Sequence, residues 1–308
     1  MLDRFVLAVL LALTLAGGAS TPATTPLVTQ LADFTVGGNR QVVVHVPSGY
    51  RADRPAPLLI MLHGWGSSGP QHENYLELAA EADERGVLYA HPNGVRDKRG
   101  DRFWNATDAC CDFDRRGIAD VRYLTDVVNQ IDSIANVDRR RIFFMGHSNG
   151  GFMSHAMACR RAGLVAAIVS YAGAAPRDWG DCRPAEPVAV LEIHGDADRV
   201  VDYDGGRIDP PGAAAPLAPF PSVNGTAALW LRRNGCSADM VRLSTRLNVA
   251  AGIGGPDGPA EAIVRQSRGC AAGGHMEVWR VPRGGHVLSL SPRFQDLVLD
   301  FLLAHPKP

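Results

Sequence analysis

The feature that most constrains the fold is a glycine-rich pentad that follows a short apolar run. Residues 142–145 (IFFM) are apolar, branched or aromatic, which predicts a buried strand, and Gly146-His147-Ser148-Asn149-Gly150 follows at once. Glycines on both sides of a serine are typical of a sharp turn from a strand into a helix, because a Cβ at those positions would collide with neighbouring backbone. We therefore expect a helix over residues 151–161 and an exposed hydroxyl on Ser148. The alternative is an accidental match in a chain with 33 glycines.

Short apolar runs and amphipathic segments alternate through the rest of the chain. Further strands are expected at residues 58–62, 87–90, 166–170, 188–194 and 276–281, and helices at 73–85, 121–134, 226–233 and 292–304. Strands that alternate with helices indicate a parallel sheet with helices on both faces. The prediction is an α/β fold of the α/β-hydrolase type, in one domain over residues 31–308.

A carboxylate follows the strand at residues 188–194. Asp198 lies beyond the carboxyl end of this strand and downstream of Ser148, where an acid that orients a catalytic histidine is found in such folds. Its role would be to hold the imidazole and to stabilise the imidazolium as it forms. Asp196 is the second choice, and a plain acidic loop or helix cap remains the alternative for both.

A histidine follows the last predicted strand. His286 lies just after residues 276–281 and completes the chain order serine, aspartate, histidine. As a general base it would take the proton of Ser148 and later return one to the leaving alcohol. His275 is the rival candidate, although it precedes the strand. Structural hydrogen bonding is expected instead for the histidines at the other strand ends, which are His63, His147 and His194.

Two backbone amides are expected to form an oxyanion hole. One is that of Asn149, at the start of the helix after Ser148, and the other is that of Trp65, in the glycine-rich loop 63–69 after a buried strand. Three aromatic side chains, those of Trp65, Trp104 and Tyr203, could line an acyl pocket as substrate-binding residues. Packing in the interior is the alternative for each of them.

Composition excludes several classes of function. The formal net charge is −1 and 46% of the residues are hydrophobic, with no basic tract or charge block that would indicate a nucleic-acid partner. No H-E-x-x-H motif or paired C-x-x-C spacing indicates a metal site. Nucleophile, base, acid and amide donors suffice for covalent acyl transfer, so no metal or organic cofactor is expected.

The first residues have the form of a secretory signal peptide. Arg4 is followed by an apolar run over residues 5–16 and by Gly17-Gly18-Ala19, which predicts cleavage near residue 19. A buried N-terminal helix is the alternative. The run is too short for a confident membrane span, so no stable membrane anchor is expected. Residues 20–30, rich in Thr and Pro, are interpreted as a flexible lead-in. The protein is thus expected to be extracellular or periplasmic.

Six cysteines fit an oxidising compartment. They are Cys110, Cys111, Cys159, Cys182, Cys236 and Cys270, and six thiols allow 15 pairings. Proximity in the sequence favours the pairs 159–182 and 236–270, which leaves the adjacent pair either bonded or reduced; free buried thiols are the alternative. Two segments, 204–222 and 237–269, have little periodicity and are interpreted as a lid and an insertion.

These motifs together resemble one esterase family. LHGWGSSG, YAHPNG, FWNATDACCDF, FFMGHSNGG and IHGDADRVV occur in order, followed by N-G-C and V-P-R-G-G-H. The chain is similar to the secreted esterases that group polyhydroxybutyrate depolymerases with LpqC-like and type-C feruloyl esterases. This resemblance implies Ser148, Asp198 and His286 as the triad, with the amides of Trp65 and Asn149 as the oxyanion hole. It also implies the disulfides 159–182 and 236–270.

The residues after the histidine differ from many of these relatives. They are Val287-Leu288-Ser289, where many relatives have a Trp-Pro pair. The expected function is a secreted serine ester hydrolase that forms an acyl-enzyme, with feruloyl-polysaccharide esters or polyhydroxybutyrate-type polyesters as small-molecule or polymeric substrates. The alternatives are an acyltransferase that uses the same triad and a non-catalytic relative that binds polysaccharide or polymer. The oligomeric state is left open.

Overall fold

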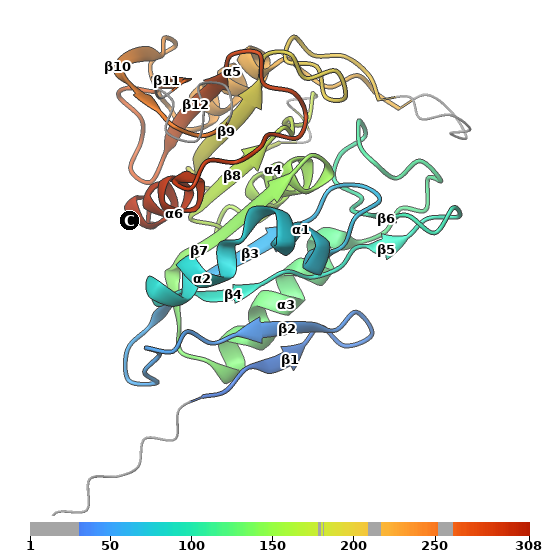
Figure 1. Ribbon diagram of the computed structural model, residues 1–308, viewed down its shortest axis with the longest axis vertical. Helices are drawn as coiled ribbons and strands as arrows, with labels where there is room; N and C mark the ends of the chain where they lie inside the picture. Colours follow the sequence, from blue (N-terminus) through green and yellow to red (C-terminus); the bar gives the residue numbers. More distant parts are fainter. Residues whose placement is uncertain (1–30, 178–179, 181, 209–216, 252–260) are drawn as a thin grey trace, which may run out of the picture. The chain divides into compact units, whose positions relative to one another are not determined.

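Figure 1 shows the computed structural model, which describes residues 31–177, 180, 182–208, 217–251 and 261–308. The described residues belong to one compact unit, 31–308. The predicted signal peptide (1–19) and lead-in (20–30) lie outside the described residues. No helix in the described part of the chain is long and apolar enough to cross a membrane.

A large sheet of ten strands runs through the described part of the chain. The strands, in spatial order, are β1 (Phe34–Val36), β2 (Val42–His45), β4 (Leu88–Ala90), β3 (Ala56–Leu62), β7 (Val137–His147), β8 (Ala167–Tyr171), β9 (Ala189–Gly195), β12 (His275–Val281), β11 (Ala262–Gln266) and β10 (Val241–Leu247). The six strands from β4 to β12 pair in parallel, and the pairs toward both edges are antiparallel. The expected α/β architecture with a mostly parallel sheet is confirmed.

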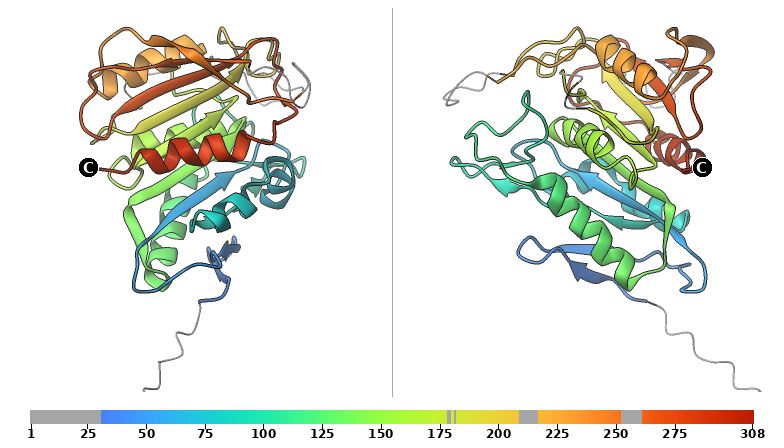
Figure 2. Two further views of the ribbon diagram at one scale, coloured as in Figure 1. Left: turned by 60° about the vertical axis from the view of Figure 1, so that its left-hand side comes forward. Right: turned by 180° about the vertical axis from the view of Figure 1, so that it is seen from behind.

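Helices cover both faces of this sheet (Figure 2). On one face lie α1 (Gly69–Leu76), α2 (Leu78–Glu84) and α6 (Phe294–Ala304), and on the other α3 (Asp120–Ile134), α4 (Asn149–Arg160) and α5 (Val223–Arg233). A buried apolar cluster lies on each side of the sheet. Every residue of β3, β8 and β9 is buried, as expected for continuous apolar strands between two helical layers. A small hairpin, β5 (Val95–Arg96) and β6 (Arg102–Phe103), lies apart.

The single helix expected over residues 73–85 is in fact two helices. Ser68 caps α1 by accepting from the amide of Gln71, so the first helix begins earlier than expected. Glu77 then adopts the left-handed conformation with φ 51° and ends α1. The carboxylate of Glu73 accepts a hydrogen bond from the amide of Ala79 at 2.9 Å, which satisfies a donor that the break leaves unpaired.

The prediction of an irregular insertion over residues 237–269 was wrong for the described part of that segment. β10 and β11 pair as an antiparallel hairpin that extends the sheet beyond β12. In the edge strand β10 the sequence VRLSTRL largely alternates apolar and polar residues, which suits a strand with one exposed face. β11, with the sequence AIVRQ, lies between β10 and β12. Residues 252–260 between them lie outside the described part.

The expected lid over residues 204–222 can be followed only at its two ends, because residues 209–216 lie outside the described part. Gly206 and Phe220 form an antiparallel bridge. The buried Phe220 ring packs edge-on against Phe152 of α4, with ring centroids 5.9 Å apart. The described ends are therefore anchored to the body of the fold, and a lid remains a prediction.

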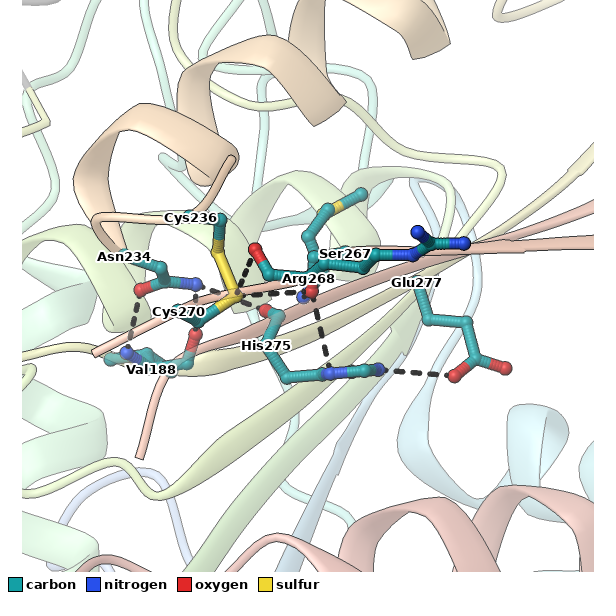
Figure 3. The surroundings of a disulfide bond; sticks show 9 residues. Val188, Asn234, Cys236, Ser267, Arg268, Cys270, His275 and Glu277 are labelled. Carbon is teal, nitrogen blue, oxygen red and sulfur yellow. Dashed lines mark hydrogen bonds and ion pairs between the residues drawn. A yellow bond between two sulfur atoms is a disulfide. The ribbon is translucent and has the colours of Figure 1, made fainter. Parts of the chain in front are cut away.

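The N-G-C motif joins three elements at the amino ends of β9 and β12. The buried side chain of Asn234 accepts from the Val188 amide at 3.0 Å and donates to the carbonyls of Val188 (2.8 Å) and His275 (3.0 Å) (Figure 3). The disulfide between Cys236 and Cys270 lies beside it. The end of α5 is thus fixed to the starts of two adjacent parallel strands.

The structure contains three disulfides. Besides Cys236–Cys270, Cys159 at the end of α4 is bonded to Cys182 in the segment before β9. Cys110 and Cys111 are bonded to each other. No cysteine is left free.

Candidate active site

Ser148 occupies a strained turn between β7 and α4. Its φ of 56° and ψ of −120° lie outside the regions that residues with side chains normally adopt. A Cβ at Gly146 would lie 2.2 Å from the Gly150 backbone, and one at Gly150 would lie 2.0 Å from the Leu62 carbonyl oxygen. Both glycines are therefore required by close backbone approach, which is the reason given for them from the sequence.

The side chains of Asp198, His286 and Ser148 form a hydrogen-bonded chain. The Nε2 atom of His286 lies 2.9 Å from Ser148 Oγ, and its Nδ1 atom lies 2.7 Å from Asp198 Oδ2. The three residues come from the ends of β9, β12 and β7, at the carboxyl edge of the parallel sheet. Their arrangement is that of a nucleophile, a base and an orienting acid.

The environment of Asp198 keeps its carboxylate ionised. The side chain is buried, and its Oδ1 atom accepts from the amides of Val200 (2.8 Å) and Val201 (3.0 Å). Burial alone would raise the pKa of Asp198, but hydrogen bonds from His194 and His286 hold it well below its usual range. The carboxylate is thus negative at neutral pH and able to stabilise an imidazolium on His286.

The two rival residues lie in other places. Asp196 accepts from the Arg283 amide through Oδ1 at 2.6 Å and pairs with Arg280 through Oδ2 at 3.5 Å, so its carboxylate is engaged away from His286. His275 stands at the first position of β12, where its Nε2 atom lies 3.1 Å from Glu277 (Figure 3). That is the opposite end of the strand from the one that leads to His286.

The loop that carries the acid is bonded to the loop that carries the base. The Asp196 amide donates to the Val281 carbonyl at 3.1 Å, and the Ala197 amide donates to the Gly284 carbonyl at 2.9 Å. These bonds continue the parallel pairing of β9 with β12 beyond the strands. The separation of Asp198 from His286 is therefore fixed by backbone hydrogen bonds.

One expected oxyanion donor follows Ser148 directly in the chain, and the other lies in the loop after β3, beside Ser148. Asn149 is the first residue of α4, so its amide is at the positive end of that helix. Its buried side chain exchanges two hydrogen bonds with the Trp104 backbone, at 2.7 and 2.9 Å. Trp65 follows Gly64, where an added Cβ would lie 3.4 Å from Ser148 Cβ. The oxyanion role of both amides stays a prediction.

The expectation that Trp104 lines an acyl pocket was wrong. Its side chain is fully buried and its Nε1 atom donates to the His63 carbonyl at 3.1 Å, so the ring is a core residue that a substrate does not touch. Trp65 and Tyr203 are partly exposed. Trp65 packs edge-on against Phe113 at 5.6 Å, and its buried Nε1 atom has no hydrogen-bond partner. A substrate role for Trp65 and Tyr203 remains a prediction.

A chain of neutral histidines, not anticipated from the sequence, supports the base. His147 Nε2 lies 2.8 Å from the His286 carbonyl oxygen and must donate to it, so Nδ1 of a neutral His147 accepts from His72 Nε2 at 3.1 Å. The Gly64 amide, 3.3 Å from that same His72 atom, is then a contact without a hydrogen bond. His72 Nδ1 accepts from the Ser67 hydroxyl at 2.9 Å.

The physical basis for their neutrality is burial. It lowers the pKa of His72 to about 4 and that of His63 to about 3, and it lowers the pKa of His147 well below the ordinary value. The rings of His72 and His147 link the loop of Trp65 to the loop of His286. We call His63, His72 and His147 the neutral set.

A second buried chain lies behind the acid. His194 Nδ1 is 3.1 Å from Glu192 Oε1, and its Nε2 donates to the Val201 carbonyl at 2.8 Å and lies 3.4 Å from Asp198 Oδ2. Glu192 Oε2 is 3.1 Å from His155 Nε2, and His155 Nδ1 accepts from Trp230 Nε1 at 3.0 Å. We call His194, Glu192 and His155 the charged set.

His194 carries a positive charge in this set. Burial would lower the pKa of His194, but hydrogen bonds to Asp198 and Glu192 outweigh it and raise the pKa to about 9. His194 is therefore an imidazolium between two carboxylates. The position of His194 in IHGDAD was visible in the sequence, but its pairing with Glu192 and Asp198 was not.

The described part of the chain contains no group of three or more His, Cys, Asp or Glu side chains placed to hold a metal ion. The histidine clusters described above are instead bonded to each other, to backbone and to carboxylates.

With this geometry in place, comparison with known proteins assigns the family. Residues 49–208, more than half of the chain, match the sequence model of the phospholipase/carboxylesterase family of α/β-hydrolases. The chain belongs to this family. Its mostly parallel sheet with helices on both faces is the α/β-hydrolase fold.

Two curated relatives of the chain are feruloyl esterases. Feruloyl esterase B of Piromyces equi is 33% identical over 203 residues, which cover 65% of this chain and 36% of that protein. Feruloyl esterase C of Emericella nidulans is 31% identical over 214 residues, covering 65% of this chain and 72% of that protein. The chain thus spans only about a third of the length of the Piromyces equi relative.

A solved structure supports the fold. The acetyl xylan esterase from Aspergillus awamori matches with a TM-score of 0.60 over 88% of this chain and 98% of that one. Its sequence identity is 14%, so the likeness concerns the architecture alone.

Proposed function

We propose that the protein is a secreted serine carboxylic ester hydrolase in which Ser148, His286 and Asp198 form the catalytic triad. The observation that carries the proposal is the hydrogen-bonded chain from Asp198 through His286 to Ser148, in a member of the phospholipase/carboxylesterase family. The strained turn at Ser148 and the ionised carboxylate of Asp198 support the same roles.

The proposed reaction has two halves. Ser148 Oγ attacks the ester carbonyl while His286 Nε2 takes its proton, and the amides of Asn149 and Trp65 stabilise the negative oxygen of the tetrahedral intermediate. Collapse of this intermediate breaks the bond to the alcohol, which leaves with the proton from His286 and gives an acyl-enzyme. Water then attacks the acyl carbon with His286 as base, and the free acid leaves as Ser148 regains its proton.

We further propose feruloyl-polysaccharide esters as the substrate class. Support comes from the identity of about a third to feruloyl esterases B and C. Export is supported by the N-terminal signal pattern and by three disulfides, since such bonds persist in oxidising compartments.

The test compares Ser148→Ala with the wild type on methyl ferulate and p-nitrophenyl butyrate. We expect the alanine variant to lose at least about a thousandfold in kcat/KM on both esters, as removal of a triad nucleophile does. Ser133→Ala, an exposed serine on α3, is the matched control and should retain wild-type activity. Methyl ferulate should be the better substrate.

Equal activity of Ser148→Ala and the wild type would refute the triad. A wild type that is inert on both esters would refute the ester hydrolase. A preference for the butyrate would move the substrate class away from feruloyl esters. Added alcohol that is converted to a new ester would favour the acyltransferase.

A further inference from the structure

Three arginines lie close together near the β10 edge of the sheet, on the face that carries α5. Arg242 of β10 and Arg265 of β11 are directly opposite each other in the antiparallel register. Arg280 of β12 is opposite Ile263, two residues from Arg265 on the same face. Since side chains two apart on a strand share a face, the three guanidinium groups lie on one side of three adjacent strands.

These arginines line a cavity of about 200 Å³ together with Ile263, Tyr203 and Asn224. We call it the arginine pocket. Asn224 stands in the first turn of α5, which lies against β12 and β9 (Figure 1). The amino end of this helix adds a positive partial charge to that of the arginines.

The positive charge of the pocket is only partly balanced. The buried Nε atom of Arg280 makes an ion pair with Asp196 Oδ2 at 3.5 Å, without the geometry of a hydrogen bond. Arg265 donates to the neutral Asn224 side chain at 2.8 Å. Within the described part of the chain, the Arg242 side chain has no hydrogen bond or ion pair. Asp239 lines the neighbouring depression, which shares Arg265 and Asn224 with the arginine pocket.

Such an arrangement weakens the fold unless an anion binds. Like charges directly opposite on neighbouring strands repel each other and destabilise the pair. The planar guanidinium group presents donors in a fork that matches the two oxygens of a carboxylate. Binding sites for whole small molecules measure about 300–1,000 Å³, so this smaller cavity suits one anionic group of a larger molecule.

The pocket adjoins the proposed catalytic residues. Arg280 is paired in register with His194 of β9, which lies 3.4 Å from Asp198. The Tyr203 ring packs edge-on against His194 with centroids 5.8 Å apart. A polymer bound with its ester group at Ser148 could therefore place a neighbouring unit over this face.

We propose that the arginine pocket binds the carboxylate of an acidic sugar unit in the polysaccharide that carries the ester. This assignment rests on the proposed function, which supplies the polysaccharide. Arg242 and Arg265 hold the carboxylate, and Arg280 with the amino end of α5 adds to the positive field.

The test is direct binding by isothermal titration calorimetry. The probes are trigalacturonate and the neutral xylotriose, with the purified protein, Arg242→Gln, and the double variant Arg242→Gln/Arg265→Gln. We expect the wild type to prefer trigalacturonate and the double variant to lose at least about tenfold in affinity, as loss of charge-assisted hydrogen bonds implies. The single variant, at an exposed position without partners, should lose less and guards against misfolding.

The matched control is Arg54→Gln/Arg99→Gln, which removes two exposed arginines outside the pocket. It should bind trigalacturonate as the wild type does. Equal affinity of the pocket variants and this control, or equal binding of the two sugars by the wild type, would overturn the proposal. Free ferulate that binds as tightly as trigalacturonate and is lost in the pocket variants would overturn the assignment to a polysaccharide.

A parallel assay separates this proposal from the proposed function. Hydrolysis of p-nitrophenyl butyrate by the wild type needs no acidic sugar. If that ester is hydrolysed and trigalacturonate shows no preference, only the pocket assignment fails. If the ester is not hydrolysed but trigalacturonate binding depends on Arg242 and Arg265, the pocket is an anion site and the ester hydrolase fails.

Discussion

The neutral set contacts the loop of His286 and the charged set contacts Asp198, and the two sets use histidine in opposite ways. His72 and His147 are bonded to each other, to a hydroxyl and to a carbonyl, none of which carries a full charge. His194 is bonded to Glu192 and lies beside Asp198. All of these rings are buried.

The difference shows that the partner, more than burial, decides the charge of a buried histidine. Without a carboxylate the cost of removing the charge from water keeps His72 and His147 neutral. With two carboxylates nearby, the same cost is outweighed in His194. The proposed acid is therefore held by a charged network, while the loop of the proposed base is held by a neutral one.

The largest effect is expected from breaking the link between the charged set and His286. Asp198→Asn removes the carboxylate that orients His286 and stabilises its imidazolium, so kcat/KM for p-nitrophenyl butyrate should fall by about 10⁴. Asp196→Asn is the matched control in the same loop and should lose less than tenfold. A larger loss in the control would move the acid role to Asp196.

A smaller effect is expected in the pH dependence of protein stability, through His194 of the charged set. His194 has a pKa of about 9 when folded and an ordinary value of 6.5 when unfolded, so the folded protein binds more protons between these pH values. The free energy of unfolding should therefore fall as pH rises from 6.5 to 9, by about 3 kcal/mol. Urea unfolding at a series of pH values measures this.

Glu192→Gln tests the origin of that slope. It removes one of the two carboxylates near His194, so the pKa of His194 should fall and the alkaline loss of stability should shrink. Glu84→Gln, at an exposed position on α2, is the matched control. An alkaline slope that is the same in Glu192→Gln and in the wild type would assign it to other groups.

The smallest effect is expected from the neutral set. His72→Asn removes hydrogen bonds between uncharged groups, which should cost about 1 kcal/mol at pH 7. The unfolded chain binds a proton near pH 6.5, whereas His72 does so only near pH 4, so wild-type stability should fall as pH decreases across this interval.

In the His72→Asn variant the free energy of unfolding should fall less steeply between pH 6.5 and 4 than in the wild type. Its fall between pH 6.5 and 9 should be unchanged, and urea unfolding measures both. His45→Asn, at a more exposed histidine, is the control. A flattened alkaline decline in His72→Asn would mean that the two sets are coupled.

The parts of the fold and site that could be predicted from the sequence are those with local signals. The G-x-S-x-G turn and the alternation of strands and helices depend on residues near one another in the chain. Asp198 and His286 could be singled out because each follows a locally predicted strand, downstream of Ser148. The structure brings those three side chains into contact. Their catalytic roles stay proposals.

The parts that could not be predicted depend on distant partners. The break at Glu77 has no glycine or proline to signal it, and it is stabilised by a side chain one turn away. The burial of Trp104 depends on His63, 41 residues earlier. The arginine pocket requires the register of β10, β11 and β12, which a charged and weakly apolar sequence did not specify.

The hydrogen bonds of the Asn234 side chain to Val188 and His275 lie at the opposite end of the strands from the proposed catalytic residues. They set the starting points of β9 and β12, and these strands run in register for seven residues before they reach the loops of Asp198 and His286. A shift of one residue in the pairing of β9 with β12 would move Asp198 relative to His286 by about 3.3 Å. That is more than the 2.7 Å between their hydrogen-bonded atoms. Contacts at the amino ends of β9 and β12 thus set the position of Asp198 relative to His286, the proposed base, at the carboxyl ends of the same strands.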